Sequence, residues 1–183
     1  MHTLSYNRRL QASQVKLSLG STVLQQYDYG YGAFNTSSGD VDTSKNNGQI
    51  GKVLGTIGTT AQSNQGFSYD ELGRLSNITE HQSSSMTTQT YSQSYSYDLY
   101  GNRSQSANST LGLQAISSSE INTATNRFIA TGSTPTTYDG AGNITVDTKF
   151  RSLKYEYDAN GRQSAVKLLD NTGLQTSVYD CAG

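Results

Sequence analysis

The stretch YEYDANGR at residues 155–162 contains the motif Tyr-Asp-x-x-Gly, which decides the fold of the chain. The motif occurs five times, and the other copies read YDELG at 69–73, YDLYG at 97–101, YDGAG at 138–142 and YDCAG at 179–183. The intervals between successive tyrosines are 28, 41, 19 and 22 residues. Five copies of a three-residue constraint in 183 residues indicate an internal repeat rather than chance.

Each copy has the chemistry of a hairpin turn. A type I turn favours Asp at its first position and Gly at its fourth, which is the spacing of Asp158 and Gly161. The carboxylate can accept a backbone N–H two residues on, and glycine takes the left-handed conformation without a Cβ clash. The tyrosine should end one strand, and the residues after the glycine should begin its antiparallel partner. The residues predicted to build these turns are Tyr69, Asp70 and Gly73; Tyr97, Asp98 and Gly101; Tyr138, Asp139 and Gly142; Tyr157, Asp158 and Gly161; Asp170 and Gly173, which keep the spacing without the tyrosine; and Tyr179, Asp180 and Gly183.

The residues between the turns alternate with the period of a β-strand. Tyr155 and Tyr157 share one face of a strand, because side chains two residues apart point the same way. The 12 residues from Asp158 to Asp170 and the 10 from there to Asp180 leave room for two strands of an up-and-down meander. The predicted fold class is therefore all-β, with tandem antiparallel β-hairpins that form a curved or spiral sheet.

The composition agrees with an ordered β protein. Ser, Thr, Asn and Gln supply 75 of the 183 residues, while charged residues are 15% and the net charge is −1. Disordered chains usually combine low hydrophobicity with high net charge, whereas this chain has 13 tyrosines. No apolar run approaches the ~20 residues that span a bilayer. The first thirty residues lack a secretory signal, and the scattered charges form no basic stripe for nucleic acid.

The N-terminal third carries weaker signals. Residues 27–34, YDYGYGAF, predict a strand with a bulge or a wide turn. Asn47-Gly48 is a strong short hairpin signal ahead of an apolar stretch. We predict one repeat β-sheet region over 1–183, with degenerate repeats in 1–66 and the five hairpin tips in 67–183.

The longest interval between tips is rich in Ser and Thr. Residues 105–137 predict a longer hairpin that carries residues 126–128 and a loop at 132–135. Residues 111–121 could form a short helix, although their serines disfavour it.

Candidate catalytic chemistry is sparse. His2 and His81 lie far apart in the sequence, and the single Cys181 cannot form an internal disulfide. Residues 40–44 resemble the start of a calcium loop, but Lys45 stands where an EF-hand requires glycine. We expect no catalytic residue, no metal site and no cofactor. Two alternatives stay open: the turn aspartates could be catalytic acids or calcium ligands, and the repeated tyrosines could be a sugar-binding ladder rather than packing residues.

The segments YDELGRL, YSYDLYGNR, YDGAGNIT and YEYDANGR resemble the YD repeats of the Rhs family. That family includes bacterial Rhs and wall-associated polymorphic toxins, the shell components of insecticidal toxin complexes, and animal teneurins. YNRRLQ at 6–11, the NNGQI stretch and TNRF at 125–128 also resemble segments between YD motifs in bacterial members, so the resemblance covers about 5–183. It implies tandem hairpins that coil into a spiral β-sheet and close into a hollow shell, which in toxin members holds a C-terminal effector until delivery.

The sequence departs from a full member of that family in ways that bear on function. It stops inside a repeat and lacks the arginine-rich, DPxG-containing core, so we expect a shell fragment or the product of a truncated reading frame. The resemblance implies a non-catalytic module of a β-shell that encapsulates or displays an effector in a secreted or cell-envelope protein. The expected partners are neighbouring YD repeats of the same chain and the enclosed effector, with no nucleic acid and no transmembrane segment.

A second function stays open beside the shell. A cell-surface repeat module could bind carbohydrate or a partner protein through exposed Tyr and Asn/Gln faces, as YSQSYSY at 91–97 suggests. A hydrolase has only scattered Asp and Ser in its favour.

Overall fold

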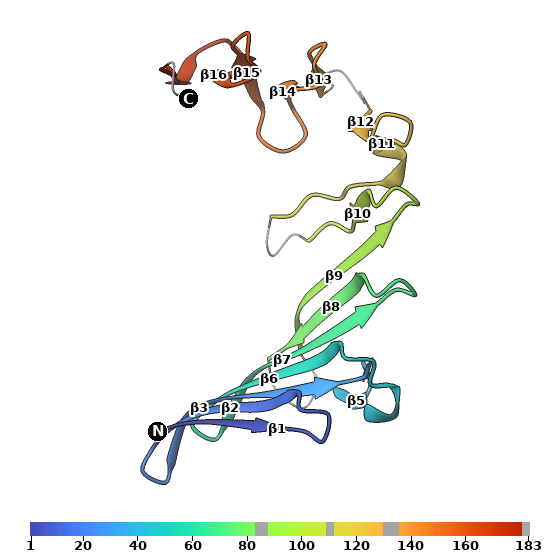
Figure 1. Cartoon of the computed structure of the whole chain (residues 1–183), viewed down its shortest axis with the longest axis vertical. Helices are drawn as coiled ribbons and strands as arrows, with labels where there is room; N and C mark the ends of the chain where they lie inside the picture. Colours follow the sequence, from blue (N-terminus) through green and yellow to red (C-terminus); the bar gives the residue numbers. More distant parts are fainter. Residues whose placement is uncertain (83–87, 109–111, 130–135, 181–183) are drawn as a thin grey trace. The chain divides into compact units, whose positions relative to one another are not determined.

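The computed structural model describes residues 1–82, 88–108, 112–129 and 136–180. Within these ranges the regular structure consists of antiparallel β-strands and short 3₁₀ helices (Figure 1). The prediction of an all-β fold built from tandem antiparallel hairpins is confirmed. No helix in the described residues is long and apolar enough to cross a bilayer.

The chain forms two compact units, residues 1–96 with 104–115, and residues 97–103 with 116–183. The first unit contains an eight-stranded sheet whose strand order follows the chain, except that β4 and β5 leave it as a separate two-stranded hairpin (Figure 1). The sheet strands are β1 (His2–Tyr6), β2 (Ala12–Leu19), β3 (Thr22–Tyr31), β6 (Ile50–Ile57), β7 (Thr60–Tyr69), β8 (Leu75–His81), β9 (Gln89–Tyr97) and β10 (Arg103–Gln105), and the separate hairpin is β4 (Ala33–Asn35) with β5 (Asp40–Asp42).

Two-residue turns connect strands at the edge of this sheet opposite the predicted tips. Leu19 pairs with Thr22, and Ile57 pairs with Thr60. The first central residue is glycine in both turns, with φ of +59° at Gly20 and +61°. Positive φ at this position matches the right-handed twist of paired strands.

The two faces of the sheet differ in chemistry. Leu4, Val15 and Tyr27 are opposite one another on three adjacent strands, so one face there is apolar. On the other face Gln14 lies opposite Asp28, and its Nε2 donates to Oδ1 of that carboxylate at 2.7 Å. The alternation of the sequence therefore becomes a division between an apolar and a polar face.

Buried positions in the described residues are mainly polar. Asn64 and Gln93 have no exposed surface, whereas the buried apolar side chain among the described residues is the small Ala165, which is 9% exposed. The Nε2 of Gln93 donates to the carbonyl of Ser106 at 2.7 Å. Strand pairing and side-chain hydrogen bonds, rather than a large apolar core, hold these sheets together.

The β4–β5 hairpin lies against the sheet where glycines leave room for it. A Cβ at Gly66 would lie 2.0 Å from the ring of Phe34, and one at Gly51 would lie 2.1 Å from the carbonyl oxygen of Gly32. Both distances are far below contact, so the absence of side chains is what lets the hairpin approach. The buried Asn64 amide donates to the carbonyl of Gly39 and fastens the turn of the hairpin.

Because of this hairpin, the turn at Asn47-Gly48 differs from the simple hairpin turn that the sequence predicted. The turn does not join two adjacent strands, because β3 pairs with β6 and the β4–β5 hairpin is inserted between them. Gly48 has φ of +99° and lies two residues before Ile50, the first residue of β6. Of the two predictions for residues 27–34, the structure shows the strand with a bulge: the β3–β6 register shifts between Gly30 and Tyr31.

The second unit contains a five-stranded sheet and a short hairpin, again in the order of the chain. The two strands of the meander predicted after Asp158 are confirmed as β16 and β17, and β16 pairs with the preceding β15. The strands are β11 (Ile121–Asn122) and β12 (Arg127–Phe128) in the hairpin, and β13 (Thr137–Tyr138), β14 (Ile144–Asp147), β15 (Leu153–Tyr157), β16 (Gln163–Leu168) and β17 (Gly173–Thr176) in the sheet.

The segment between the Asp98 and Asp139 tips contains less regular secondary structure than predicted. The hairpin spans residues 121–128 rather than 105–137, and the loop predicted at 132–135 lies outside the described residues. In place of the helix considered at 111–121, the described residues hold a 3₁₀ turn at Ser118–Glu120. The Ser117 side chain caps this turn, because serine competes for backbone groups better than it extends a helix. A second 3₁₀ turn, Thr43–Lys45, precedes β6 in the first unit.

Candidate functional site: hairpin tips and tyrosine latches

The tip at Asp158 is a closed ring of hydrogen bonds around one carboxylate. Its Oδ1 accepts the backbone N–H of Asn160 at 2.9 Å and that of Arg162 at 3.0 Å. The Gly161 N–H donates to the Asp158 carbonyl, and φ of this glycine is +76°. The loop is a type I turn followed by a left-handed residue, which explains why the motif needs Asp and Gly three residues apart.

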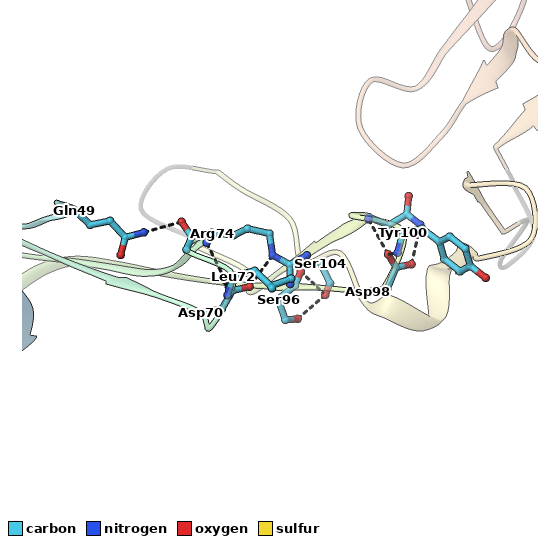
Figure 2. Close-up of polar contacts among 10 residues, drawn as sticks. Gln49, Asp70, Leu72, Arg74, Ser96, Asp98, Tyr100 and Ser104 are labelled. Atoms are coloured by element: carbon cyan, nitrogen blue, oxygen red, sulfur yellow. Dashed lines mark hydrogen bonds and ion pairs between the residues drawn. The ribbon is translucent and has the colours of Figure 1, made fainter. Parts of the chain in front are cut away.

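Three other copies of the motif have the same ring. Asp70, Asp98 and Asp139 each accept the backbone N–H groups two and four residues on, at 2.8 to 3.0 Å. Their glycines have φ between +78° and +95°. Figure 2 shows the Asp70 ring with Arg74, and separately the Asp98 ring.

The residue after the glycine completes the ring, a feature that we did not assign from the sequence. Its side chain donates to Oδ2 of the aspartate: Arg74 and Arg162 through Nε at 2.7 and 2.9 Å, Asn102 and Asn143 through Nδ2 at 2.7 and 2.9 Å. The signal was present in the sequence, because Gly is followed by Arg or Asn in all four of these copies.

These hydrogen bonds lower the pKa of the tip carboxylates. At Asp98 and Asp139 the largest cause is the side-chain amide of the asparagine four residues on. At Asp158 it is the backbone N–H of the arginine in that position. At Asp70 desolvation is the largest single influence and opposes the shift, but the combined bonds from the arginine outweigh it. Hydrogen bonds that favour the charged form keep all four carboxylates ionised.

A further tip of the same type lies at the N-terminal end of the chain, where no YDxxG motif marks it. Asn7 Oδ1 accepts the N–H groups of Arg9 and Gln11 at 2.9 and 3.1 Å, and its Nδ2 donates to Gln11 Oε1 at 2.7 Å. Leu10 occupies the left-handed position with φ of +59°. Asparagine thus replaces aspartate and leucine replaces glycine within an unchanged backbone loop.

The turn predicted from Asp170 to Gly173 is wrong in register. The Asn171 N–H donates to the Leu168 carbonyl and the Leu168 N–H donates to the Thr172 carbonyl, so the loop begins two residues earlier. Asn171 takes the left-handed position with φ of +74°, and Gly173 is the first residue of β17. Asparagine tolerates this conformation, so the glycine was not required there. Asp170 accepts the Thr172 N–H at 2.8 Å within the loop.

The fifth motif is described only in part. Tyr179 and Asp180 are described, whereas Gly183 and Cys181 lie outside the described residues.

Tyrosines of three motif copies latch successive strands together, whereas the Tyr138 hydroxyl accepts the backbone N–H of Phe128 at 3.1 Å. The Tyr157 hydroxyl donates to the Ile144 carbonyl at 2.9 Å, and the Tyr179 hydroxyl donates to the Gln163 carbonyl at 2.8 Å. In each case the acceptor is the second residue after the left-handed glycine of the preceding tip. The same spacing recurs in the first unit. Tyr31, which is outside the motif, donates to the Ala12 carbonyl two residues after the left-handed Leu10, and Tyr69 donates to the Ile50 carbonyl two residues after Gly48, both at 2.9 Å.

The register of the strands explains why the latch forms at this position. Pairing between β14 and β15 starts at Val146 and Lys154, so Ile144 lies beyond the ladder. Across the tip Ile144 pairs with Tyr138, after a register shift. Its carbonyl therefore points toward the next hairpin where backbone pairing has stopped, and the Tyr157 hydroxyl satisfies it instead.

The contacts of the tyrosines help to decide whether they are a sugar-binding ladder or packing residues. The ring of Tyr179 also lies under the Arg162 guanidinium, 4.4 Å from ring centroid to Cζ, as a cation–π contact. In the YSQSYSY stretch Tyr91 and Tyr95 are half-buried, and burial is the main cause that raises the pKa of Tyr91. Hydroxyls bound in latches are occupied by the protein, which favours a structural role over a sugar-binding ladder.

The other candidate residues do not assemble into a reactive centre in the described part of the chain. His2 begins β1, whereas His81 ends β8 and is 7% exposed. Among residues 1–82, 88–108, 112–129 and 136–180, no group of three or more His, Cys, Asp or Glu could hold a metal ion. Comparison with known proteins found no family model and no curated protein that matches the chain.

Proposed function

We propose that the chain is a non-catalytic structural module, part of an Rhs-type β-shell that encapsulates or displays an effector in a secreted or cell-envelope protein. The observation that carries this proposal is the latch, which recurs at Tyr69, Tyr157 and Tyr179 and joins each of their strands to the strand before it. A tip ring sets the turn, and a tyrosine hydroxyl binds the strand that leaves the preceding tip. An array built in this way extends by repetition and needs no large apolar core at each step.

The residues that sequence analysis singled out support a structural role. The aspartates of four tips are fully engaged by backbone and side-chain donors, and their glycines hold the left-handed position. A carboxylate held in this way is poorly suited to proton transfer at neutral pH, because its pKa is lowered rather than raised.

The test has a genetic and a biochemical part. Sequencing the source locus on both sides of this segment should reveal many more Tyr-Asp-x-x-Gly repeats, followed by an unrelated domain. In the complete protein that domain should resist a protease that digests it when it is expressed alone. A locus without further repeats, or a downstream domain that is cut equally fast in both forms, would remove the shell proposal.

A second candidate is a repeat module that binds carbohydrate or protein at a cell surface. It is favoured by a different observation, a cavity beside the Asp70 tip with an aromatic and polar lining.

A further inference from the structure

The strand β1 lies at one end of the eight-stranded sheet, and its outer edge pairs with no described strand (Figure 1). Beside β1, the Met1 ammonium donates to the Ser18 carbonyl, and the Met1 carbonyl accepts the Ser18 N–H. Alternate residues of an antiparallel pair face the same neighbour, so the backbone groups of Thr3 and Ser5 also face β2. The backbone groups that point to the open edge are therefore those of His2, Leu4 and Tyr6.

Tyr6 ends this strand and holds the position of a latch tyrosine. It directly precedes the tip at Asn7, as Tyr157 directly precedes the tip at Asp158. Within the described residues the Tyr6 hydroxyl has no hydrogen-bond acceptor, and the residue is 57% exposed. The tyrosines that form latches are all less exposed than this one: Tyr31, Tyr69, Tyr157 and Tyr179. Tyr6 is thus a latch that lacks its acceptor.

We propose that the β1 edge binds the exit strand of one further repeat hairpin, namely the hairpin that precedes β1 in a shell protein. An exit strand is the strand that leaves a tip, and its first residue supplies the carbonyl that Tyr6 lacks. The inference rests on the proposed function, because it names the surface on which a preceding repeat docks. It gives a binding role to a tyrosine that lies outside every YDxxG motif.

The direction of the described latches identifies the strand that Tyr6 should bind. In all four latches, the acceptor is the first residue of the strand that comes before the tyrosine in the chain and pairs antiparallel with its strand. These acceptors are Ala12 of β2, Ile50 of β6, Ile144 of β14 and Gln163 of β16. A strand docked on β1 by the same rule is antiparallel to it and begins beside Tyr6.

The pairing of β14 with β15 gives the register of the docked strand. Tyr157 occupies the place of Tyr6 directly before its tip, and Leu153 occupies the place of His2 at the start of the strand. The last residue of β14, Asp147, is opposite Leu153, and the carbonyl of its first residue binds the Tyr157 hydroxyl. A strand of the length of β14 in the same register therefore covers β1 from Tyr6 to His2.

The chemistry of β1 suits a strand that is covered by another. Exposed edge strands are usually protected by charged side chains or proline, which prevent pairing with other strands. The sequence of β1, HTLSY, contains no Lys, Arg, Asp, Glu or Pro. Leu4 is 48% exposed opposite Val15 on the apolar face, and a docked strand buries more of it. The edge thus lacks the features that keep strands apart.

The experiment measures amide hydrogen exchange in the ¹⁵N-labelled chain with a synthetic peptide of residues 137–148, which carries the Asp139 tip and its exit strand. In the free chain, the N–H of Leu4 should exchange quickly, and those of Thr3 and Ser5 slowly, because only the latter face β2. Saturating peptide should slow exchange at Leu4 by about threefold or more, with a Kd in the millimolar range.

A fusion keeps the test decisive, because an isolated hairpin is only marginally stable in water. The same segment is placed before Met1 and joined to it by Gly-Ser, the pair that connects β2 to β3 at Gly20-Ser21. Covalent attachment raises the effective concentration of the strand. Exchange at Leu4 should then slow by about tenfold or more relative to the parent chain.

Two substitutions make the test specific to the edge. Tyr6→Phe removes the latch hydroxyl and should weaken peptide binding about fivefold, whereas Tyr29→Phe, on the interior strand β3, should change it by less than about twofold. Leu4→Pro removes an outward N–H without removing a bond to β2. It should abolish the peptide-induced shifts along β1 and leave the resonances of the other strands as in the parent chain.

Three results would overturn the inference. The first is unchanged exchange at Leu4 in the fusion, and the second is equal binding by Tyr6→Phe and the parent chain. The third is protection of Leu4 that rises with chain concentration in the absence of peptide, which would make the edge a contact between two copies. The locus test separates this inference from the shell: upstream repeats without protection of Leu4 would remove the docking site alone, whereas a locus without repeats removes the shell whatever β1 binds.

Discussion

The tips at Asp158 and Asn7 have the same backbone loop but different residues at the two positions that define the repeat. In both, the first residue of the loop donates its N–H to the carbonyl four residues on, at 2.8 and 2.9 Å. The left-handed position is Gly161 with φ of +76° in one and Leu10 with φ of +59° in the other. The comparison shows that a side-chain oxygen at the first position and a left-handed fourth residue define the loop, while Asp and Gly supply them at the lowest cost.

The largest effect is expected when the glycine of a motif tip is replaced by a β-branched residue. Gly161→Val forces valine into the left-handed region and should lower the free energy of unfolding by about 1–3 kcal/mol. Thermal unfolding followed by circular dichroism measures this loss. Gly173→Val is the matched control: Gly173 is the first residue of β17 and has no positive φ, so valine should be tolerated there. An unchanged melting temperature for Gly161→Val would contradict the assigned loop.

Removing one latch should have the next largest effect. Tyr157→Phe deletes the hydroxyl that donates to the Ile144 carbonyl and should cost about 1 kcal/mol. Amide hydrogen exchange should accelerate at β14 and β15, the strands that the latch joins. Tyr155→Phe is on the same strand and removes a hydroxyl that takes no part in the latch. If both variants lose the same stability, the hydroxyl bond is not what connects the hairpins.

Replacing the left-handed leucine of the tip at Asn7 should change the free energy of unfolding by a smaller amount and in the opposite direction, as a stabilisation. Leu10→Gly removes a left-handed leucine, worth roughly 1–2 kcal/mol, but adds about 0.4–1 kcal/mol of chain entropy to the unfolded state. The net expectation is a stabilisation of about 0.5–1 kcal/mol in denaturant unfolding. Leu72→Gly replaces a leucine of similar exposure, 78% against 82%, that has no positive φ, and it should destabilise. A loss of stability in Leu10→Gly would show that the leucine is held by contacts rather than strained.

Sequence reasoning found the features that depend on neighbours in the chain. The Asp and Gly spacing correctly placed the four motif tips that the structure describes in full, because turn chemistry acts over five residues. It missed the tip at Asn7, because leucine rather than glycine occupies the left-handed position there. It also misplaced the turn near Asp170, because Asn171 rather than Gly173 takes the left-handed position.

The latch and the cavity could not be predicted in this way. The hydroxyl of Tyr157 and the carbonyl of Ile144 meet only because backbone pairing stops between them, which requires the register of two hairpins. The cavity depends on Phe34 resting on Gly66, a contact between elements 32 residues apart. Neither relation leaves a local pattern in the sequence.

The smallest effect is expected when one cap acceptor replaces another. Asp139→Asn keeps an oxygen for the two backbone N–H groups, and the Asn143 amide can rotate so that its oxygen accepts from the new amide. Asn7 and Gln11 already form such an amide pair, at 2.7 Å. At neutral pH this variant should therefore unfold almost as the parent chain does. Asp158→Asn should lose more stability, because Arg162 has only donors and cannot accept from the new amide.

Low pH should distinguish an aspartate cap from an asparagine cap, because only the aspartate titrates. The Asn143 side chain is the main reason that the pKa of Asp139 lies below its ordinary value, so the folded carboxylate binds a proton less readily than the unfolded one. Its contribution to stability is complete above the unfolded pKa, near 4, and is lost as the pH falls through the lower folded value. Asp139→Asn has no titrating group at this position, so denaturant titrations between about pH 5 and pH 2 should show a shallower decline than in the parent chain. Parallel declines would mean that the tip carboxylate does not stabilise the fold through its charge, and that asparagine is an equivalent cap at position 139 across this pH range.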